Sequence, residues 1–290
     1  MTRTPARSGR ARRRRALEAV LTYVGAVALA AFLLAPFVWL LISSLAPLAD
    51  LIQRPLHWIP PHASFDRYRT IFFGADGRDF RFALRNSAVV ASIATSISLV
   101  AGMLGAYALS RFPSRGRSGL LYLMLATYMT PPVAILLPLY LILSRLGLLN
   151  NVVGLALVYT SFLTPFLTWI LKGFFDAIPE ELEQAARIDG ATRVGSMVRI
   201  TLPLSLPGVI TAVLFGVILA WDEFLYALIF TSSAAAKTLP VAISEFTSRH
   251  AVDFGLMAAG GIIAALPPLI LAFALQRYLI AGLTAGSVKG

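Results

Sequence analysis

Two adjacent carboxylates, Asp222 and Glu223, lie inside an otherwise apolar stretch that runs from Leu206 to Phe230. A charged side chain near the middle of a membrane costs about 2.5 to 3.5 kcal/mol, so two neighbouring carboxylates are expected to face water or a partner. Trp221 and Tyr226 flank them with rings that offer both an apolar face and a hydrogen-bonding group. One interpretation is that these four residues line a path through the membrane. The other is that the carboxylates cap the outer interface, pair with an Arg or hydrogen-bond between helices.

Other chemistry-bearing residues give no sign of an enzyme. The sequence contains no Cys, which excludes a disulfide framework, a thiolate nucleophile and a zinc-thiolate site. The three histidines lie in predicted loops without metal-binding spacing: His57, His62 and His250. A phosphate-binding loop needs Gly before its Lys, whereas Leu, Ala and Val precede Lys172, Lys237 and Lys289. We therefore expect no catalytic residue, no metal and no cofactor in this chain, and any ATP must be bound by a partner.

The composition is that of a membrane protein. Of the 290 residues 58% are hydrophobic and only 13% are charged, and the mean hydropathy is +0.77. Soluble domains carry about 25% charged residues, and a globule of this size cannot hide so much apolar surface. A disordered chain, a soluble enzyme and a secreted disulfide scaffold are excluded. The net charge of +11 would suggest nucleic acid in a soluble protein, but its placement beside apolar segments indicates membrane anchoring instead.

Six stretches lack Asp, Glu, Lys and Arg, and each exceeds the roughly 20 residues that a helix needs to cross a bilayer. They are Ala19–Ala49, Asn86–Ser110, Ser118–Ser144, Leu146–Leu171, Ile200–Trp221 and Phe254–Gln276. The sequence therefore predicts an all-α membrane protein with transmembrane helices over about 19–44, 86–111, 118–144, 150–175, 206–230 and 254–280. Prolines inside several of these segments predict bent helices.

The distribution of positive charge predicts the orientation. Seven Arg crowd the tail 1–18, and the apolar run after it is too long for a cleaved signal peptide. If the tail is inside, the loops after the second and fourth helices are also inside, and both are rich in Lys and Arg. The shorter outer loops hold only Arg145, Lys237 and Arg249. The positive-inside rule then places both termini in the cytoplasm, with 1–18 as a basic tail and 19–290 as a multi-pass membrane domain.

The longest hydrophilic stretch on the predicted inner side, 176–203, reads as two short helices joined at a glycine. Pro179 is suited to a first helical residue, and Gly190 can stop the helix about eleven residues later. Leu182, Ala185, Ala186 and Asp189 recur at the spacing of one helix face. A second helix is expected over about 192–199, ended by Pro203. Spacing alone leaves open whether this hairpin has a partner.

At these residues the chain resembles a known family. Gln184, Ala185, Ala186, Gly190, Ile200, Leu202 and Pro203 match the EAA loop of ATP-binding-cassette (ABC) importer permeases in spacing and in position between the fourth and fifth helices. The resemblance implies that 176–203, including Glu183 and Asp189, is a coupling loop that docks on a separate ATPase subunit. The family usually has Glu at the position of Gln184. The neighbouring Glu183 is rotated by about 100° on a helix and cannot make the same contact.

Further runs resemble the carbohydrate importers, and in particular the shorter permease of the maltose system. They are Ser64–Tyr68, Gly105–Phe112, Ser144–Asn150, Trp221–Leu225 and Gly282–Gly290. The resemblance implies a second homologous permease, two ATP-binding subunits, an extracytoplasmic sugar-binding protein and no nucleic acid. The alternative that remains from the residues alone is a stand-alone ion-coupled transporter that uses Asp222 and Glu223. A membrane-embedded enzyme is a third option, and it leaves the inner loop unexplained.

Overall fold

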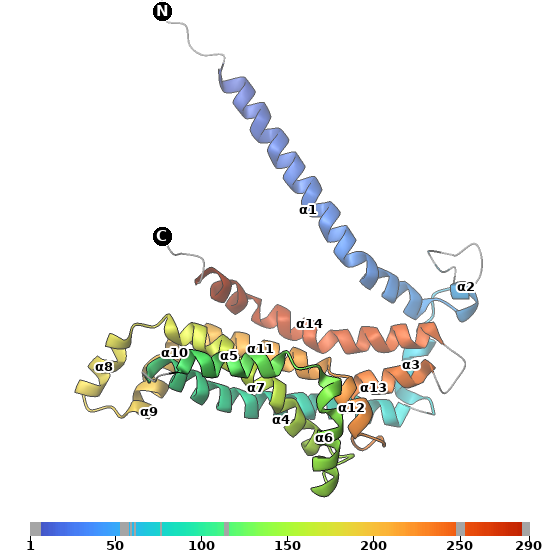
Figure 1. Ribbon diagram of the computed structural model, residues 1–290. Coiled ribbons are helices and arrows are strands. Elements are labelled where there is room, and N and C mark those ends of the chain that lie inside the picture. The colour runs from blue at the N-terminus through green and yellow to red at the C-terminus, as the bar shows by residue number, and fades with distance from the viewer. Residues whose placement is uncertain are drawn as a thin grey trace, which may run out of the picture.

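The computed structural model describes residues 7–52, 58, 60, 62–75, 77–112, 116–247 and 253–285, and it is helical, with no strand among these residues (Figure 1). The long helices are α1 (Arg7–Leu45), α4 (Gly77–Arg111), α5 (Arg117–Tyr128), α6 (Pro132–Arg145), α7 (Val152–Asp176), α11 (Leu206–Trp221) and α14 (Phe254–Ala285). The short ones are α2 (Leu48–Ile52), α3 (Asp66–Phe73), α8 (Glu180–Ile188), α9 (Arg193–Ser196), the π-helix Met197–Thr201, α10 (Leu202–Leu204), α12 (Leu225–Phe230), α13 (Leu239–Ser244) and the 3₁₀ turn Glu245–Thr247.

Four of the described helices, α1, α4, α7 and α14, are long and apolar enough to cross a membrane. Two bent pairs pass the same test together, α5 with α6 and the segment Arg193–Leu204 with α11, so up to six spans result if each pair is one span. The predicted segments 86–111, 150–175 and 254–280 coincide with most of α4, α7 and α14. The all-helical prediction is confirmed.

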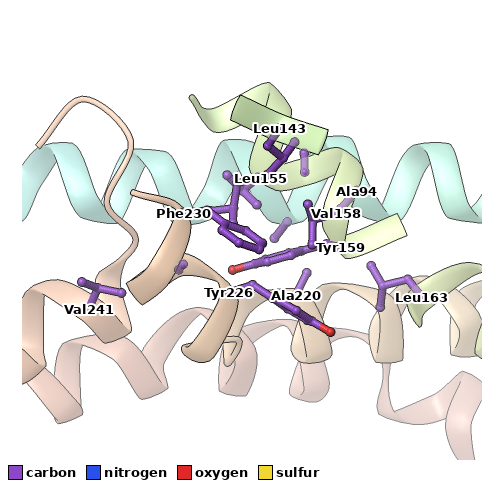
Figure 2. Packing of buried hydrophobic residues seen from close by; sticks show 14 residues of the cluster. Ala94, Leu143, Leu155, Val158, Tyr159, Leu163, Ala220, Tyr226, Phe230 and Val241 are labelled. Carbon is purple, nitrogen blue, oxygen red and sulfur yellow. The ribbon is translucent and has the colours of Figure 1, made fainter. Parts of the chain in front are cut away.

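The core is formed where α4, α7 and α11 pack side by side. Gly216 of α11 faces Thr95 of α4, and a Cβ atom at Gly216 would lie only 2.8 Å from the Thr95 methyl group. Small residues at such a crossing let helices approach closely, which is how helices associate in lipid. At one end of the bundle a second buried cluster joins α4, α6, α7, α11 and α12, with Tyr159, Tyr226 and Phe230 at its centre (Figure 2).

The predicted third helix, 118–144, is broken and not continuous. The chain bends by 88° between α5 and α6. Pro131 and Pro132 follow α5 after two intervening residues, and a residue before proline is disfavoured in the helical conformation. Pro132 instead begins α6, where its missing N–H is not needed. Two adjacent prolines therefore end one helix and start the next in a new direction.

The predicted fifth helix, 206–230, is also interrupted, and the interruption falls on the two carboxylates. α11 ends at Trp221, and α12 begins at Leu225 after the Asp222–Phe224 segment. The Glu223 carboxylate accepts hydrogen bonds from the backbone N–H groups of Tyr226 and Ala227, at 2.8 and 3.1 Å. A side chain that binds the first free donors of a helix favours a helix start over a helix interior. Asp222 and Glu223 thus lie at a break and not within a continuous helix.

α1 leaves the rest of the bundle. It packs against α14 near its C-terminal end, and its first turns extend away from the other helices (Figure 1). None of its most apolar 18-residue window is buried within this chain. The arrangement leaves most of this long apolar helix uncovered by its own chain.

Candidate functional site

The loop between α7 and α11 contains the predicted hairpin, and its glycine has the expected role. Gly190 has a φ of +93°, a left-handed conformation that glycine adopts at low cost. Its N–H donates to the Arg187 carbonyl at 3.1 Å, and the Ala191 N–H donates to the Ala186 carbonyl at 2.9 Å. This pair of bonds is a Schellman motif, which ends α8. Pro179 precedes the first helical residue rather than being it.

The second half of the hairpin is longer than predicted, because helical structure does not stop at Pro203. α9 begins after Thr192, whose hydroxyl accepts the Gly195 N–H, and continues through the π-helix into α10. Pro203 is the second residue of α10 and follows the π-helix directly, so the chain remains helical through this proline. The chain turns only at Ser205, by 80°, into α11. The prediction that Pro203 ends this helix is wrong.

The hairpin exposes apolar side chains at the end of the bundle. Ile188 is 87% exposed and Val194 66%, and Leu182 and Val198 are also largely uncovered. Beside them Gln184, Ala185 and Asp189 are exposed and Ala186 is half-buried. Ile200 and Leu202 are half-buried, and Leu202 packs against the core of α4, α7 and α11, while Pro203 is exposed. Some predicted coupling residues therefore lie on the exposed surface of the hairpin, whereas Ile200 and Leu202 are turned toward the protein interior. Ile188, the most exposed apolar residue of the hairpin, was not among the predicted residues.

Glu183 points the other way, into the protein. Its carboxylate pairs with the Arg111 guanidinium at the end of α4, with Nε and Oε1 2.7 Å apart and both side chains less than 10% exposed. The hydroxyl groups of Tyr107 and Thr201 donate to the same carboxylate, each at 2.6 Å. Arg111 also donates to the Ile178 carbonyl at 3.0 Å. One buried carboxylate thus joins α4, α8 and the π-helix.

These contacts determine the charge of Glu183. Burial alone raises the pKa of a carboxyl group, but the hydrogen bonds from Thr201, Tyr107 and Arg111, together with the positive charge of Arg111, outweigh it. The pKa of Glu183 is held below its ordinary value of 4.5, so the group is ionised at neutral pH.

The second candidate site lies at the break between α11 and α12. Besides capping α12, the Glu223 carboxylate accepts a hydrogen bond from the Tyr159 hydroxyl of α7 at 2.5 Å. Glu223 therefore hydrogen-bonds between helices and caps one of them, as the second sequence interpretation allowed. It also borders a cavity of about 480 Å³ beside the α5–α6 bend, so the first interpretation is compatible with the same geometry. The side chain of Asp222 is exposed and is not among the residues that line this cavity.

The cavity has aromatic and hydroxyl-bearing walls. Its lining residues are Thr127, Tyr128, Thr130, Pro132, Ile135, Ser161, Phe162, Glu223 and Tyr226. Tyr226 is only 4% exposed, and its ring stacks on Phe162 with centroids 6.1 Å apart. Figure 2 shows the hydroxyl groups of Tyr159 and Tyr226 pointing in opposite directions. Tyr159 bonds Glu223, whereas the Tyr226 hydroxyl has no hydrogen-bond partner within the described part of the chain.

Trp221 is not part of that cavity. Its ring is buried against α3, α4 and α14, and its Nε1–H donates to the Ala264 carbonyl of α14 at 3.0 Å. Ala264 lies four residues before Pro268, which has no N–H to bond that carbonyl. The indole N–H of Trp221 thus replaces the backbone N–H that would donate to the Ala264 carbonyl if residue 268 were not proline. Among the histidines, His62 is exposed, and His57 and His250 lie outside the described residues.

Comparisons with known proteins identify the family to which the chain belongs. Residues 80–284 match the family described as the binding-protein-dependent transport system inner membrane component. The chain is 37% identical to the sulfoquinovosyl glycerol transport system permease protein SmoH of Agrobacterium fabrum, over 88% of each chain. It is 38% identical to the trehalose transport system permease protein SugB of Mycobacterium tuberculosis, over 89% of this chain and 93% of that one.

A third relative is the trehalose/maltose transport system permease protein MalG of Thermococcus litoralis, 32% identical over 96% of this chain and 99% of the other. Among solved structures, a bacterial ABC transporter that imports the acidic polysaccharide alginate has a chain of the same fold. The TM-score is 0.74 at 21% identity, covering 96% of this chain and 99% of that one. Proteins of this kind are transport components and not enzymes. The chain therefore belongs to the family of binding-protein-dependent transport system inner membrane components, the permease subunits of ABC transporters.

Proposed function

We propose that this chain is one of two homologous permease subunits of an ABC importer that carries a carbohydrate across a bacterial cytoplasmic membrane. Two ATP-binding subunits lie below it, and an extracytoplasmic sugar-binding protein delivers the solute from outside. The observation that carries the proposal is the hairpin 176–203 of a member of this family, with Leu182, Ile188, Val194 and Val198 exposed at the end of the bundle. Exposed apolar patches mark protein interfaces, and a separate ATPase is the occupant that an ABC permease requires.

The arrangement of the helices supports six spans with both ends in the cytoplasm. The first turns of α1, the last turns of α14 and the hairpin around α8 lie toward the same end of the bundle, on the left of Figure 1. α2, α3 and α13 lie at the opposite end. Counting α5 with α6 and the Arg193–Leu204 segment with α11 as single spans gives the six crossings that this topology needs. The binding protein then docks on the outer segments 50–85 and 231–253.

Carbohydrate chemistry suits the cavity at the α5–α6 bend. Sugars present flat apolar faces to aromatic rings and hydroxyl groups to polar side chains, and this cavity offers Tyr128, Phe162, Tyr226 and Ser161. We infer that Glu223 and Tyr226 border the translocation path, with Asp222 exposed beside it. Trp221 does not line the path, but its hydrogen bond to the Ala264 carbonyl holds α11 against α14. Trehalose, maltose and sulfoquinovosyl glycerol, which appear in the names of the relatives, are the first solutes to test.

The stand-alone ion-coupled alternative is not supported. It needs a carboxylate that is free to bind and release an ion, whereas Glu223 holds α12 and Tyr159 through three hydrogen bonds. The family to which the chain belongs depends on a binding protein.

Reconstitution of the complete importer in proteoliposomes tests the proposal. Uptake of one of the named sugars is expected to need ATP on the ATPase side and the binding protein on the other. A Tyr226→Phe variant, which loses only a hydroxyl group, should raise the KM for uptake several-fold and leave ATP hydrolysis unchanged. Tyr122→Phe, at a ring that is 69% exposed on α5, is the matched control. Uptake by the chain alone, driven by an ion gradient without ATP, would contradict the proposal.

A further inference from the structure

The Arg111–Glu183 pair is the most buried ion pair among the described residues. Its side chains are 5% and 7% exposed, whereas in each of the other pairs at least one side chain is a quarter or more exposed. A buried pair of this kind is held in place only when further hydrogen bonds complete it. Tyr107 and Thr201 provide two of these bonds to the carboxylate.

The pair lies where three elements meet. Arg111 is the last residue of α4, Glu183 lies in the first turn of α8, and Thr201 ends the π-helix that precedes α10. Beside it, the Ser110 hydroxyl donates to Asp176 at the end of α7 at 2.7 Å. The Arg193 guanidinium stacks on the Phe112 ring, with 4.7 Å between its central carbon and the ring centroid. The hairpin is thus fixed to the end of α4 through both Glu183 and Arg193, and the Ser110 bond joins α4 to the end of α7.

We propose that Glu183 is the positioning residue of the coupling hairpin. Its buried carboxylate, held by Arg111, Tyr107 and Thr201, makes the hairpin one rigid body with α4. Motion imposed on the exposed face of α8 therefore reaches the membrane helices instead of being lost in loop movement. This inference rests on the proposed function, in which an ATPase moves that face.

The proposal assigns separate tasks to the two neighbouring residues of the EAA loop. Gln184 is exposed and lies on the side that meets the partner, and it carries no charge. Glu183 is buried and charged, and its charge is paired with that of Arg111 in the same chain. The exposed apolar side chains of the hairpin then meet the ATPase, and the charge of Glu183 serves to hold the hairpin in place.

The test measures the distance between two spin labels in the purified full complex. The chain has no Cys, so substitutions at Ile188 on α8 and Ile97 on α4 give two unique labelling sites. In the wild-type background we expect a narrow distance distribution that is the same with and without a non-hydrolysable ATP analogue. Glu183→Gln and Arg111→Met should widen it about twofold or more, because each leaves a buried partner unpaired.

Two controls separate positioning from folding. Glu181→Gln removes an exposed carboxylate from the same helix and should leave the distribution narrow. Arg111→Lys keeps the positive charge but loses the planar set of donors, so it should restore only part of the narrowness that Arg111→Met loses. A distribution for Glu183→Gln as narrow as that of the wild type would overturn the proposal. Failure of the wild-type chain to retain an ATPase would instead contradict the proposed function. The distances between the two spin labels would still test the role of Glu183.

Discussion

At the scale of single residues, the coupling hairpin depends on groups whose roles differ between neighbours. Gly190 ends α8 because it alone tolerates the left-handed conformation there without strain. Glu183 and Gln184 are adjacent, yet one is buried in an ion pair and the other is exposed. The motif by itself gives the positions of these residues, but the direction in which each side chain points comes from the packing of α8 on α4.

Replacing Gly190 with Val should break the stop between the two short helices. A β-branched residue at φ +93° costs about 1 to 3 kcal/mol of strain. We expect at least about a tenfold loss of the ATPase that co-purifies with the chain, with insertion into the membrane unchanged. Gly173→Val on α7 is the control, because that glycine has open space around its Cβ position and no positive φ. Wild-type recovery of the ATPase with Gly190→Val would show that the turn has no docking role.

Stability should depend on pH through Glu183. Its pKa is lower in the folded chain than the ordinary 4.5, so the folded state binds the proton less well. The stabilisation from the ionised carboxylate is therefore complete above about pH 5 and is lost as the pH falls through the folded pKa. The melting temperature of the wild type should exceed that of Glu183→Gln by a constant amount from pH 7 to about pH 5, and the difference should shrink below pH 4.5. A difference that stays constant down to pH 3 would show that the charge of Glu183 does not contribute.

At the scale of the elements, the breaks in the membrane helices are built from identifiable interactions. α11 ends where Glu223 caps α12, and α5 ends where two prolines begin a new direction. In α14, Pro268 leaves the Ala264 carbonyl without its helical donor, and Trp221 of α11 replaces it. The irregularities at Glu223 and Pro268 are thus matched by partners on other elements, Tyr159 and Trp221, as an apolar solvent demands.

A double-mutant cycle can measure the Trp221 contact. Trp221→Phe keeps an aromatic ring but removes the indole N–H, and it should lower stability by about 1 kcal/mol or more. In a Pro268→Ala background the restored backbone N–H can bond the Ala264 carbonyl, so the same substitution should cost less. Thermal unfolding in detergent gives both values. Equal costs in the two backgrounds would mean that the indole does not compensate for the proline.

The sequence predicted the helical class, most of α7 and α14, and the glycine stop of the hairpin, because local propensity and apolar run length determine these features. It missed the first nine residues of α4, which begins at Gly77 and not at 86. It did not predict that Glu223 caps a new helix at this point, nor that Tyr159, 64 residues away, donates to the same carboxylate. Nor did it predict the burial of Glu183, whose partner Arg111 lies 72 residues earlier. Both carboxylates were visible as charges in unusual places, but their partners emerge only when α4, α7 and α11 pack together.

At the scale of the whole molecule, the chain looks like one part of a larger assembly. α1 carries a long apolar surface that its own chain does not cover, and the hairpin around α8 exposes a second one at the end of the bundle. The first surface is suited to lipid or a neighbouring permease, and the second to a cytoplasmic subunit. The cavity beside the α5–α6 bend is lined by residues of α5, α6, α7 and α12 and of the breaks between them.

The most direct test of this account is a cross-link from the hairpin. Ile188→Cys places one cysteine on an otherwise cysteine-free chain, at a side chain that is 87% exposed. In inside-out membrane vesicles that contain the full complex, a short bifunctional reagent at this position should join the chain to its ATPase. A membrane-impermeant thiol reagent should label it only from the cytoplasmic side. Labelling from the outer side, or an ATPase that never cross-links although it is present, would contradict the account.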